Sequence, residues 1–333
     1  MIKLSILPWC RQLKIAYLLR VRPDLEDIIP NDVESVRIEV GDDGLYSRED
    51  LDKVKEVEAF IVGMEPVNEQ ILSAAPALKI VQRLGVGYET LDLEATAKRA
   101  IPACNLEGVN REAVAEHCLA LMLALAKQLP SALALTQQAD WASARQLTTQ
   151  TCELYGKTLG IVGFGNTGSA LAQRAHAFGM PVLYNDIGTV DTTLAKSLNA
   201  TATDKHTLYR QSEFVCVCTD LNDTSRMMID ADALNTMGSN TRFVCCARGG
   251  IVDENALATA LADGTIAAAA IDVFEVEPIR ADNPLIDLEN CLLTSHVAGV
   301  AHDTTMRIWH RAHDNVRAVL QDGEKPRWIR NGL

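Results

Sequence analysis

The chain has 333 residues, which is long enough for two domains and a substantial buried core. Charged residues make up 23% and hydrophobic residues 48%, as in a globular protein rather than a disordered one. The net charge of −13 comes without a long basic run, which argues against a nucleic acid or an anionic membrane as partner. A few local cations can still bind a small anionic substrate.

Nine cysteines are scattered through apolar segments. None of them has C-x-x-C or Cys/His metal-ligand spacing, so the sequence predicts no metal site. The N-terminus has no signal-peptide core or cleavage site, and no apolar run reaches the length of about 18 residues that a membrane span needs. These features favour reduced thiols in a cytoplasmic protein.

Strands alternating with helices are predicted over the first hundred residues, which indicates a small parallel α/β domain. The first strand is 14–19, with 2–7 as an alternative that the pattern leaves open. The other expected strands are 36–40, 59–63 and 79–83, and the helices are 48–55, 68–74 and 91–100. Gly85 and Gly87 then follow the last of these strands. Their backbone N–H groups could bind an anion, although a simple strand-ending turn explains the two glycines equally well.

From Asn110 the pattern changes to a helix of residues 110–128 that is apolar on almost every side. Such a helix should be buried on several sides, either by crossing between domains or by meeting its own copy in a dimer. Pro130 is expected to end it. The Thr- and Gln-rich stretch up to Gln150, which contains Trp141, predicts a surface loop or arm.

A glycine-rich turn opens the second half of the chain. Residues 159–162 predict a buried strand, and Gly163, Gly165 and Gly168 then form a G-x-G-x-x-G turn that leads into a helix. In a dinucleotide site the first glycine permits a tight turn, the second admits the pyrophosphate, and the third allows close packing of helix and strand. The N-terminus of the helix then offers N–H groups to the phosphates.

The next predicted strand, 182–185, ends in Asp186, where a dinucleotide site needs a carboxylate for the adenosine ribose. An acid at this position would repel a ribose 2′-phosphate, so it favours NAD over NADP. Later strands are expected at 214–219, 242–246, 268–272 and 291–294, with helices at 230–237, 254–263 and 302–321. Because the last helix follows the last strand, it most simply returns to the first domain. We therefore expect a discontinuous domain of residues 1–108 and 300–333, interrupted by a domain of residues 109–299.

Three charged residues stand near predicted strand ends, where the loops of a doubly wound sheet face a ligand. They are Arg248, Glu277 and His296. Hydride transfer to a carbonyl needs a proton donor, and histidine has a suitable pKa near neutrality. A carboxylate behind the imidazole fixes its tautomer, and an arginine can hold a substrate carboxylate. Each residue alone has an ordinary structural explanation, so the prediction depends on their combination with the dinucleotide motif.

At this point the sequence resembles the D-isomer-specific 2-hydroxyacid dehydrogenases, the family of D-3-phosphoglycerate dehydrogenase, glyoxylate/hydroxypyruvate reductase and D-lactate dehydrogenase. The resemblance begins near Lys14 and extends over nearly the whole chain. Its motifs are Gly85-Val86-Gly87, Asn110 with Val114-Ala115-Glu116, Gly163-Phe164-Gly165-Asn166-Thr167-Gly168 with Asp186, Ala247-Arg248-Gly249-Gly250, Asp272-Val273, Glu277-Pro278 and His296.

This resemblance implies an α/β fold in which a Rossmann-type NAD-binding domain is inserted into a flavodoxin-like substrate-binding domain. It also implies Arg248, Glu277 and His296 as the catalytic residues and a homodimer formed through the NAD-binding domains. The implied NAD site consists of Gly163, Gly165, Asn166, Thr167, Gly168, Asp186, Thr219, Ala247, Arg248, Asp272, His296 and Gly299. A small anionic 2-oxo or 2-hydroxy acid would be held by Arg83, Gly85, Val86, Gly87 and Arg248, chiefly through backbone N–H groups of the 83–88 loop.

Four residues depart from the family pattern. Cys218 replaces a frequent His, Asp220 and Ser295 replace prolines, and Cys245 replaces a common Asn. None of these changes removes a catalytic residue, so the expected function is NAD-dependent interconversion of a D-2-hydroxy acid and its 2-oxo acid. Two alternatives stay open: a non-catalytic, NAD-sensing binding protein and a phosphite- or formate-type dehydrogenase.

Overall fold

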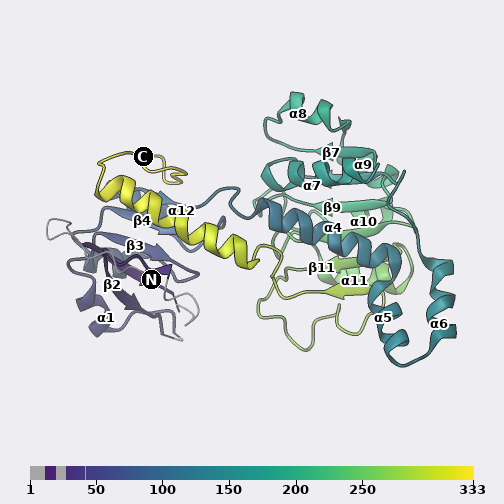
Figure 1. Ribbon diagram of the computed structural model, residues 1–333, viewed down its shortest axis with the longest axis horizontal. Coiled ribbons are helices and arrows are strands. Elements are labelled where there is room, and N and C mark those ends of the chain that lie inside the picture. Colours follow the sequence, from purple (N-terminus) through teal and green to yellow (C-terminus); the bar gives the residue numbers. More distant parts are fainter. Residues whose placement is uncertain (1–11, 20–27, 42) are drawn as a thin grey trace, which may run out of the picture. The chain divides into compact units, whose positions relative to one another are not determined.

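Two parallel β-sheets organise the chain, each within its own unit (Figure 1). The structure is a computed structural model, and it describes residues 12–19, 28–41 and 43–333. The first unit consists of Met1–Asn110 and His302–Leu333, and the second unit consists of Arg111–Ala301. The second unit is therefore inserted into the first.

The sheet of the first unit has five parallel strands in the order β2-β1-β3-β4-β5. This is the strand order of flavodoxin-like folds. The strands are β1 (Leu13–Leu18), β2 (Val33–Ile38), β3 (Ala59–Val62), β4 (Ile80–Arg83) and β5 (Ala103–Cys104). The position of β1 agrees with the first expected location of this strand, while the alternative at 2–7 lies outside the described residues.

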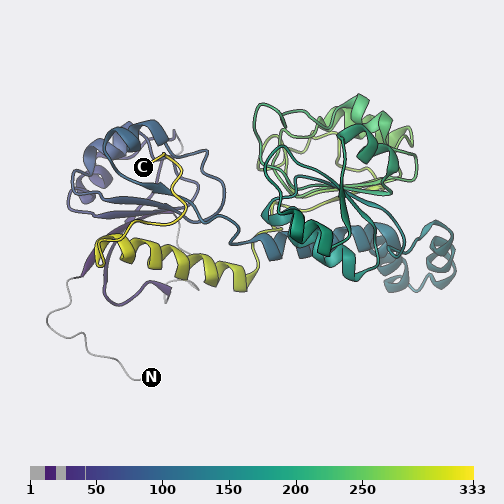
Figure 2. The ribbon, with the colours of Figure 1, turned by 90° about the horizontal axis from the view of Figure 1, so that it is seen from above.

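Side chains alternate between the two faces of this sheet, and helices cover both faces. Ala16 and Leu18 of β1 pack with the helices α1 (Arg48–Lys53), α2 (Glu69–Ala74) and α3 (Leu93–Lys98) or the segments next to them. Leu13, Ile15 and Tyr17 pack on the opposite face against α12 (His302–Leu320). Figure 2 shows α12 lying along that face.

A buried hydrogen-bond chain also connects α12 to β1. The Tyr17 hydroxyl lies 2.8 Å from Nε2 of His313, and Nδ1 of His313 lies 2.8 Å from the carbonyl oxygen of Trp309. Because that carbonyl can only accept, Nδ1–H donates to it, and Nε2 accepts from the tyrosine. Burial lowers the pKa of His313, so both contacts depend on the neutral imidazole.

The sheet of the second unit has seven parallel strands in the order β12-β11-β10-β9-β6-β7-β8. Counted from β6, this order contains the 3-2-1-4-5-6 arrangement of Rossmann folds. The strands are β6 (Leu159–Val162), β7 (Val182–Asn185), β8 (Ala200–Ala202), β9 (Phe214–Val217), β10 (Arg242–Cys245), β11 (Ala268–Ile271) and β12 (Cys291–Leu293). The predicted fold class, a Rossmann-type domain inserted into a flavodoxin-like domain, is confirmed.

Helices cover both faces of this sheet as well. On one face lie α4 (Arg111–Lys127) and α7 (Asn166–Ala177), and the core beneath them includes Cys216 of β9. On the other face, the core around Val215 and Val217 packs with α9 (Lys205–Gln211), α10 (Ala231–Thr236) and α11 (Glu254–Ala262). The helix α8 (Thr192–Ser197) precedes β8. The sequence analysis did not anticipate α8, α9 or β8, which have few buried residues.

The expectation that Pro130 ends the apolar helix is wrong, and of the two alternatives for the next stretch, a surface loop or arm, the loop is wrong because the exposed segment is helical. The helix α4 ends at Lys127, and α5 (Leu129–Gln137) begins after Gln128, with Pro130 in its first turn. Proline is compatible with a first turn because the N–H that it lacks would have no helical partner there. Next come α6 (Trp141–Gln146), with Asp140 as its N-cap, and a short 3₁₀ helix of residues 147–150.

The helix α4 is fully buried along one side only within this chain. Leu119 and Leu123, on other sides of the helix, are partly buried. Among the described residues, no single helix has the length and apolar character of a membrane span, and only α4 and α5 together, bent by 62°, meet that test.

We expect the free energy of unfolding to fall as the pH drops below about 6.5, the ordinary pKa of histidine. The folded chain lowers the pKa of His313, so the unfolded chain binds this proton more readily. Stability from this residue is therefore fully present above about pH 6.5 and is lost as the pH falls toward the folded pKa. Urea unfolding at a series of pH values measures the effect.

The matched comparison is His313→Gln with His310→Gln, because His310 is exposed on the same helix. His313→Gln should reduce the pH dependence of unfolding, and His310→Gln should retain it. An identical pH dependence in both variants would show that the buried imidazole is not its source.

Candidate active site

The glycine turn between β6 and α7 is fixed by close backbone contacts. Gly163 has a φ of +93°, and a Cβ atom there would lie 2.8 Å from the backbone of Cys218 and Thr219. A Cβ atom at Gly168 would lie 1.9 Å from the carbonyl oxygen of Gly163. A side chain at Gly165 would instead meet no atom within 4 Å. The first and third glycines are therefore required by packing, whereas the second leaves open space above the turn.

This open space is suited to the phosphates of a dinucleotide. Gly165 is the N-cap residue of α7 and has no side chain to bond the first N–H groups, which belong to Asn166 and its successors. Those N–H groups and the helix dipole favour an anion at this end of α7. The residues present therefore fit a bound dinucleotide cofactor.

Asp186 lies directly after β7, beside the same turn. One carboxylate oxygen accepts the backbone N–H of Phe164 at 2.5 Å, and the other accepts that of Gly188 at 2.7 Å. The side chain is partly exposed, so its remaining lone pairs can accept ribose hydroxyl groups. These two bonds fix the carboxylate beside the glycine turn.

The other residues expected at the cofactor site follow further strands of this sheet. Thr219 follows β9, Ala247 and Arg248 follow β10, and Gly299 lies after β12. Because the strands are parallel, these loops share the carboxyl edge of the sheet with the glycine turn. A Cβ atom at Gly249 would lie 1.7 Å from the carbonyl oxygen of Phe274, so the loop after β10 packs directly on the loop after β11.

Asp272 follows β11 and holds the segment that carries His296. Its side chain is fully buried. The carboxylate accepts the hydroxyl of Thr294 at 2.6 Å and the backbone N–H groups of Val297 and Ala298 at 3.0 and 2.9 Å. The backbone carbonyl oxygen of Asp272 also accepts the N–H of His296 at 2.7 Å. These bonds support His296 in a left-handed conformation, with a φ of +55°, that costs a non-glycine residue free energy.

His296 and Glu277 form a hydrogen-bonded pair. Nδ1 of His296 lies 2.7 Å from Oε2 of Glu277, and the other carboxylate oxygen accepts the N–H of Phe274 at 3.0 Å. Both side chains are partly exposed. The carboxylate directs the Nδ1 proton toward itself and leaves Nε2 on the opposite side of the ring. This arrangement suits an imidazole that exchanges a proton at Nε2.

Arg248 lies in the same unit, and its Nη1 donates to the carbonyl oxygen of Ala247 at 2.7 Å. The substrate-binding residues expected near the start of the chain lie in the other unit. Arg83 is buried there, and its guanidinium donates to the carbonyl oxygens of Val62 and Leu84. Its guanidinium therefore shapes the start of the 83–88 loop.

The glycines of that loop are also held from one side. The carbonyl oxygen of Gly85, whose φ is +145°, accepts the N–H of Leu106 at 2.8 Å. The carbonyl oxygen of Val86 accepts Nδ2 of Asn105 at 2.6 Å. The loop thus directs two carbonyl groups toward residues 105 and 106, and it remains a candidate for binding a carboxylate through its N–H groups.

One contact at the site could not be predicted from the sequence. Nε2 of His117 on α4 lies 3.2 Å from Oγ1 of Thr294. Thr294 in turn donates to Asp272. The residues come from three distant parts of the chain, so no local spacing could have shown this connection.

Comparisons with known proteins place the chain in a family. The model of the D-isomer specific 2-hydroxyacid dehydrogenase, NAD binding domain, matches residues 119–298. Glyoxylate reductase of Korarchaeum cryptofilum is 36% identical over 279 residues, which is 83% of this chain and 83% of that protein. Glyoxylate/hydroxypyruvate reductase B of Escherichia coli is 35% identical over 267 residues, which is 80% of this chain and 82% of that protein.

A solved structure agrees with these matches. The NADPH-dependent glyoxylate/hydroxypyruvate reductase of Sinorhizobium meliloti superposes with a TM-score of 0.80 at 28% sequence identity. The superposition covers 96% of this chain and 97% of that one. Fold and matches together define an NAD(P)-dependent 2-hydroxyacid dehydrogenase. The chain belongs to the D-isomer specific 2-hydroxyacid dehydrogenase family, which confirms the resemblance drawn from its motifs.

The glycine turn predicts different effects for two alanine substitutions. Gly168→Ala forces a methyl group onto the carbonyl of Gly163 and should destabilise the second unit by about 1–3 kcal/mol. Gly165→Ala meets no protein atom, so it should change stability by less than about 1 kcal/mol while weakening NADH binding. Thermal unfolding and NADH fluorescence titration measure the two effects. Equal destabilisation by both substitutions would contradict this assignment of roles.

Proposed function

We propose that this protein reduces a small 2-oxo acid to the D-2-hydroxy acid with NADH, using His296 and Glu277 as the acid–base pair. The observation that carries the proposal is the 2.7 Å contact between Nδ1 of His296 and Oε2 of Glu277. It occurs at the carboxyl edge of the sheet that holds the glycine turn. The similarity to glyoxylate and glyoxylate/hydroxypyruvate reductases supports glyoxylate and hydroxypyruvate as the first substrates to test.

The cofactor would be held by the glycine turn, by Asn166 and Thr167 at the start of α7, and by Asp186 at the adenosine ribose. Thr219, Ala247, Asp272 and Gly299 complete the proposed site. When bound, the reduced nicotinamide supplies a hydride to the carbonyl carbon. The residues of this chain bind and orient the substrate and supply the proton.

His296 carries the proton in this mechanism. Protonated on both nitrogens, its imidazole donates Nε2–H to the substrate carbonyl oxygen, which becomes the hydroxyl group of the product. Glu277 accepts Nδ1–H throughout, which fixes the ring orientation and stabilises the positive charge before transfer. In the oxidising direction Nε2 takes the proton back.

Arg248 and the backbone N–H groups of Gly85, Val86 and Gly87 have an orienting role. A guanidinium matches the planar shape of a carboxylate and can bind both of its oxygens. Arg83 contributes by holding the loop through the carbonyl groups that its guanidinium bonds.

His296→Ala tests the proton-transfer role. We expect the turnover number on glyoxylate or hydroxypyruvate to fall by about 10²–10⁴-fold, the usual contribution of a general acid. NADH affinity should change much less. Glu277→Gln should also lower turnover and should alter the pH profile, since the ring loses its charged partner. Stopped-flow turnover at several pH values measures both variants, and wild-type turnover in His296→Ala would exclude the mechanism.

We also propose NAD rather than NADP as the cofactor, because an acid after β7 would repel the 2′-phosphate of an NADP ribose bound there. Because the Sinorhizobium meliloti relative is NADPH-dependent, the cofactor preference of this chain has to be measured. Wild-type protein should show a higher kcat/KM with NADH than with NADPH. Asp186→Asn, which removes the charge and keeps the shape, should shift that ratio toward NADPH by about tenfold, or 1.4 kcal/mol. A wild-type preference for NADPH would contradict the role of Asp186.

A homodimer formed through the second unit is proposed on the apolar side chains that this unit leaves accessible. Leu129 and Leu133 of α5 are 46% and 54% exposed, and Trp141 of α6 is 71% exposed. Such exposed apolar side chains on α5 and α6 are suited to contact with a second copy. Light scattering should give twice the chain mass of 36.3 kDa, and a mass of one chain would exclude the dimer.

A further inference from the structure

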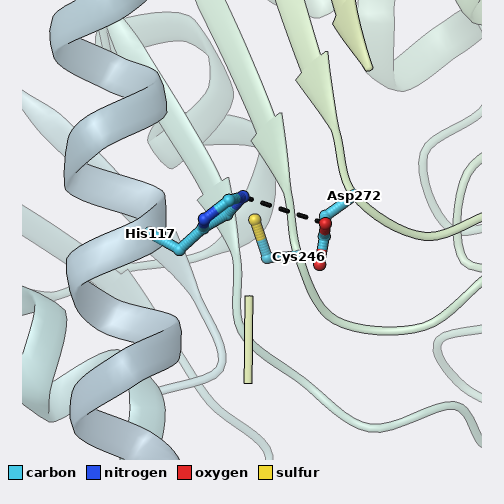
Figure 3. Close-up of side chains that lie close together, drawn as sticks. All are labelled: His117, Cys246 and Asp272. Carbon is cyan, nitrogen blue, oxygen red and sulfur yellow. Dashed lines mark ion pairs between the residues drawn. The ribbon is translucent and has the colours of Figure 1, made fainter. Parts of the chain in front are cut away.

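Three potential metal ligands meet beneath α4 at the carboxyl edge of the second sheet. They are Nε2 of His117, Sγ of Cys246 and a carboxylate oxygen of Asp272, and all three atoms lie within 4.8 Å of one another. Figure 3 shows the imidazole of His117 directed from α4 toward Asp272, with the thiol of Cys246 beside them. The residues come from α4, from the end of β10 and from the end of β11.

The cluster is buried and electronegative. Asp272 is fully buried, Cys246 is 7% exposed, and the side chain of His117 is 23% exposed. Nε2 of His117 lies 3.8 Å from Oδ1 of Asp272. Among the described residues, no lysine or arginine forms an ion pair with this carboxylate. Contact with Cys118, burial and the charge of Asp272 raise the pKa of Cys246. A buried carboxylate next to thiols is a setting that a cation would stabilise.

We propose that His117, Cys246 and Asp272 form a binding site for Zn²⁺ or a similar thiophilic cation. Imidazole, thiolate and carboxylate are the three ligand types that zinc binds in proteins. With zinc bonds of about 2.1 Å to nitrogen and oxygen, tetrahedral geometry places these two atoms about 3.4 Å apart. The distance of 3.8 Å between Nε2 of His117 and Oδ1 of Asp272 therefore requires only a small movement.

The surrounding bonds favour such a site. The hydroxyl of Thr294 and the N–H groups of Val297 and Ala298 fix the carboxylate of Asp272. Ligating carboxylates are held in this way in metalloproteins, because such bonds orient the ligand before the ion arrives. This site could not be predicted from the sequence, since the three residues are distant in the chain and follow no metal-ligand spacing.

Proton balance follows from the ligand types. His117 offers the lone pair of Nε2 when its ring proton is on Nδ1, and Asp272 binds the cation as a carboxylate. Cys246 loses its thiol proton to solvent as the metal–sulfur bond forms. With water in the fourth position, each ion bound releases one proton. Binding should therefore strengthen as the pH rises.

Occupation of this site would interfere with the cofactor, because Asp272 also belongs to the proposed NAD site. This consequence rests on the proposed function, whereas the metal site does not. We expect Zn²⁺ to weaken NADH binding to the wild-type protein. It should have little effect on NADH binding to the Cys246→Ala variant.

Cobalt is a suitable probe, because Co²⁺ bound to thiolate absorbs in the near ultraviolet and takes the same ligands as zinc. Titration of the reduced, chelator-treated full-length protein should show one Co²⁺ per chain with this absorption band. Cys246→Ala should lose the band, and His117→Gln should weaken Co²⁺ binding by at least about tenfold. Cys245→Ala is the matched control, since Cys245 packs on the opposite face of the sheet and should leave the band unchanged.

Absence of the band in the wild-type protein would overturn the proposal. An unchanged Co²⁺ affinity in His117→Gln would also overturn the proposal. Because His117 is partly exposed on a helix, this variant decides the question even if Cys246→Ala fails to fold. A band that survives both substitutions would assign the metal to other thiols and would also exclude this site. NADH fluorescence with and without Zn²⁺ is measured separately, so a protein that binds cobalt but no NADH would refute the proposed function and not the metal site.

Discussion

The buried carboxylate of Asp272 is the interaction on which the candidate site depends. It accepts hydrogen bonds from one hydroxyl and two backbone N–H groups of residues 294–298. The backbone carbonyl of Asp272 accepts the N–H of His296. Each hydrogen bond to a charged acceptor contributes about 1.5–3 kcal/mol, so these bonds favour the conformation of the segment that holds the left-handed His296. The position of the imidazole opposite Glu277 follows from this anchor.

The glycine turn is likewise fixed by contacts within the protein. Gly163 and Gly168 approach each other and the backbone of Cys218 so closely that no side chain is tolerated, which brings the start of α7 to the edge of the sheet. Gly165 then leaves its surroundings open. Rigid packing beneath an open surface is what a phosphate site requires, because the N–H groups must be positioned before the anion binds.

Much of this organisation could be predicted from the sequence, because the motifs carry their own physical reasons. The glycine turn, the strand that ends in Asp186 and the alternation of strands and helices led to the family and the fold class, and both are confirmed. The α5–α6 segment was predicted as a surface loop or arm and its helices were missed, since exposed helices of mixed polarity lack a clear apolar face. The left-handed His296 could not be foreseen, because its conformation depends on bonds from Asp272, which lies on another strand.

His117 shows a further limit of sequence reasoning. On its own helix it is an ordinary polar position, and its meaning arises only where α4 crosses the ends of β10 and β11. The catalytic roles of Arg248, Glu277 and His296 stay predictions, although the structure brings Glu277 and His296 into contact. The substrate-binding role of the 85–87 loop likewise stays a prediction.

The most direct test of the account is NADH oxidation by the purified wild-type protein with a panel of 2-oxo acids, followed at 340 nm, with chiral analysis of the product. The panel contains glyoxylate, hydroxypyruvate, pyruvate and phenylpyruvate, and the product of each chiral reaction is resolved. The account predicts turnover with at least one of these acids and a product of the D configuration. Tight NADH binding without oxidation by any acid, or an L product, would contradict it.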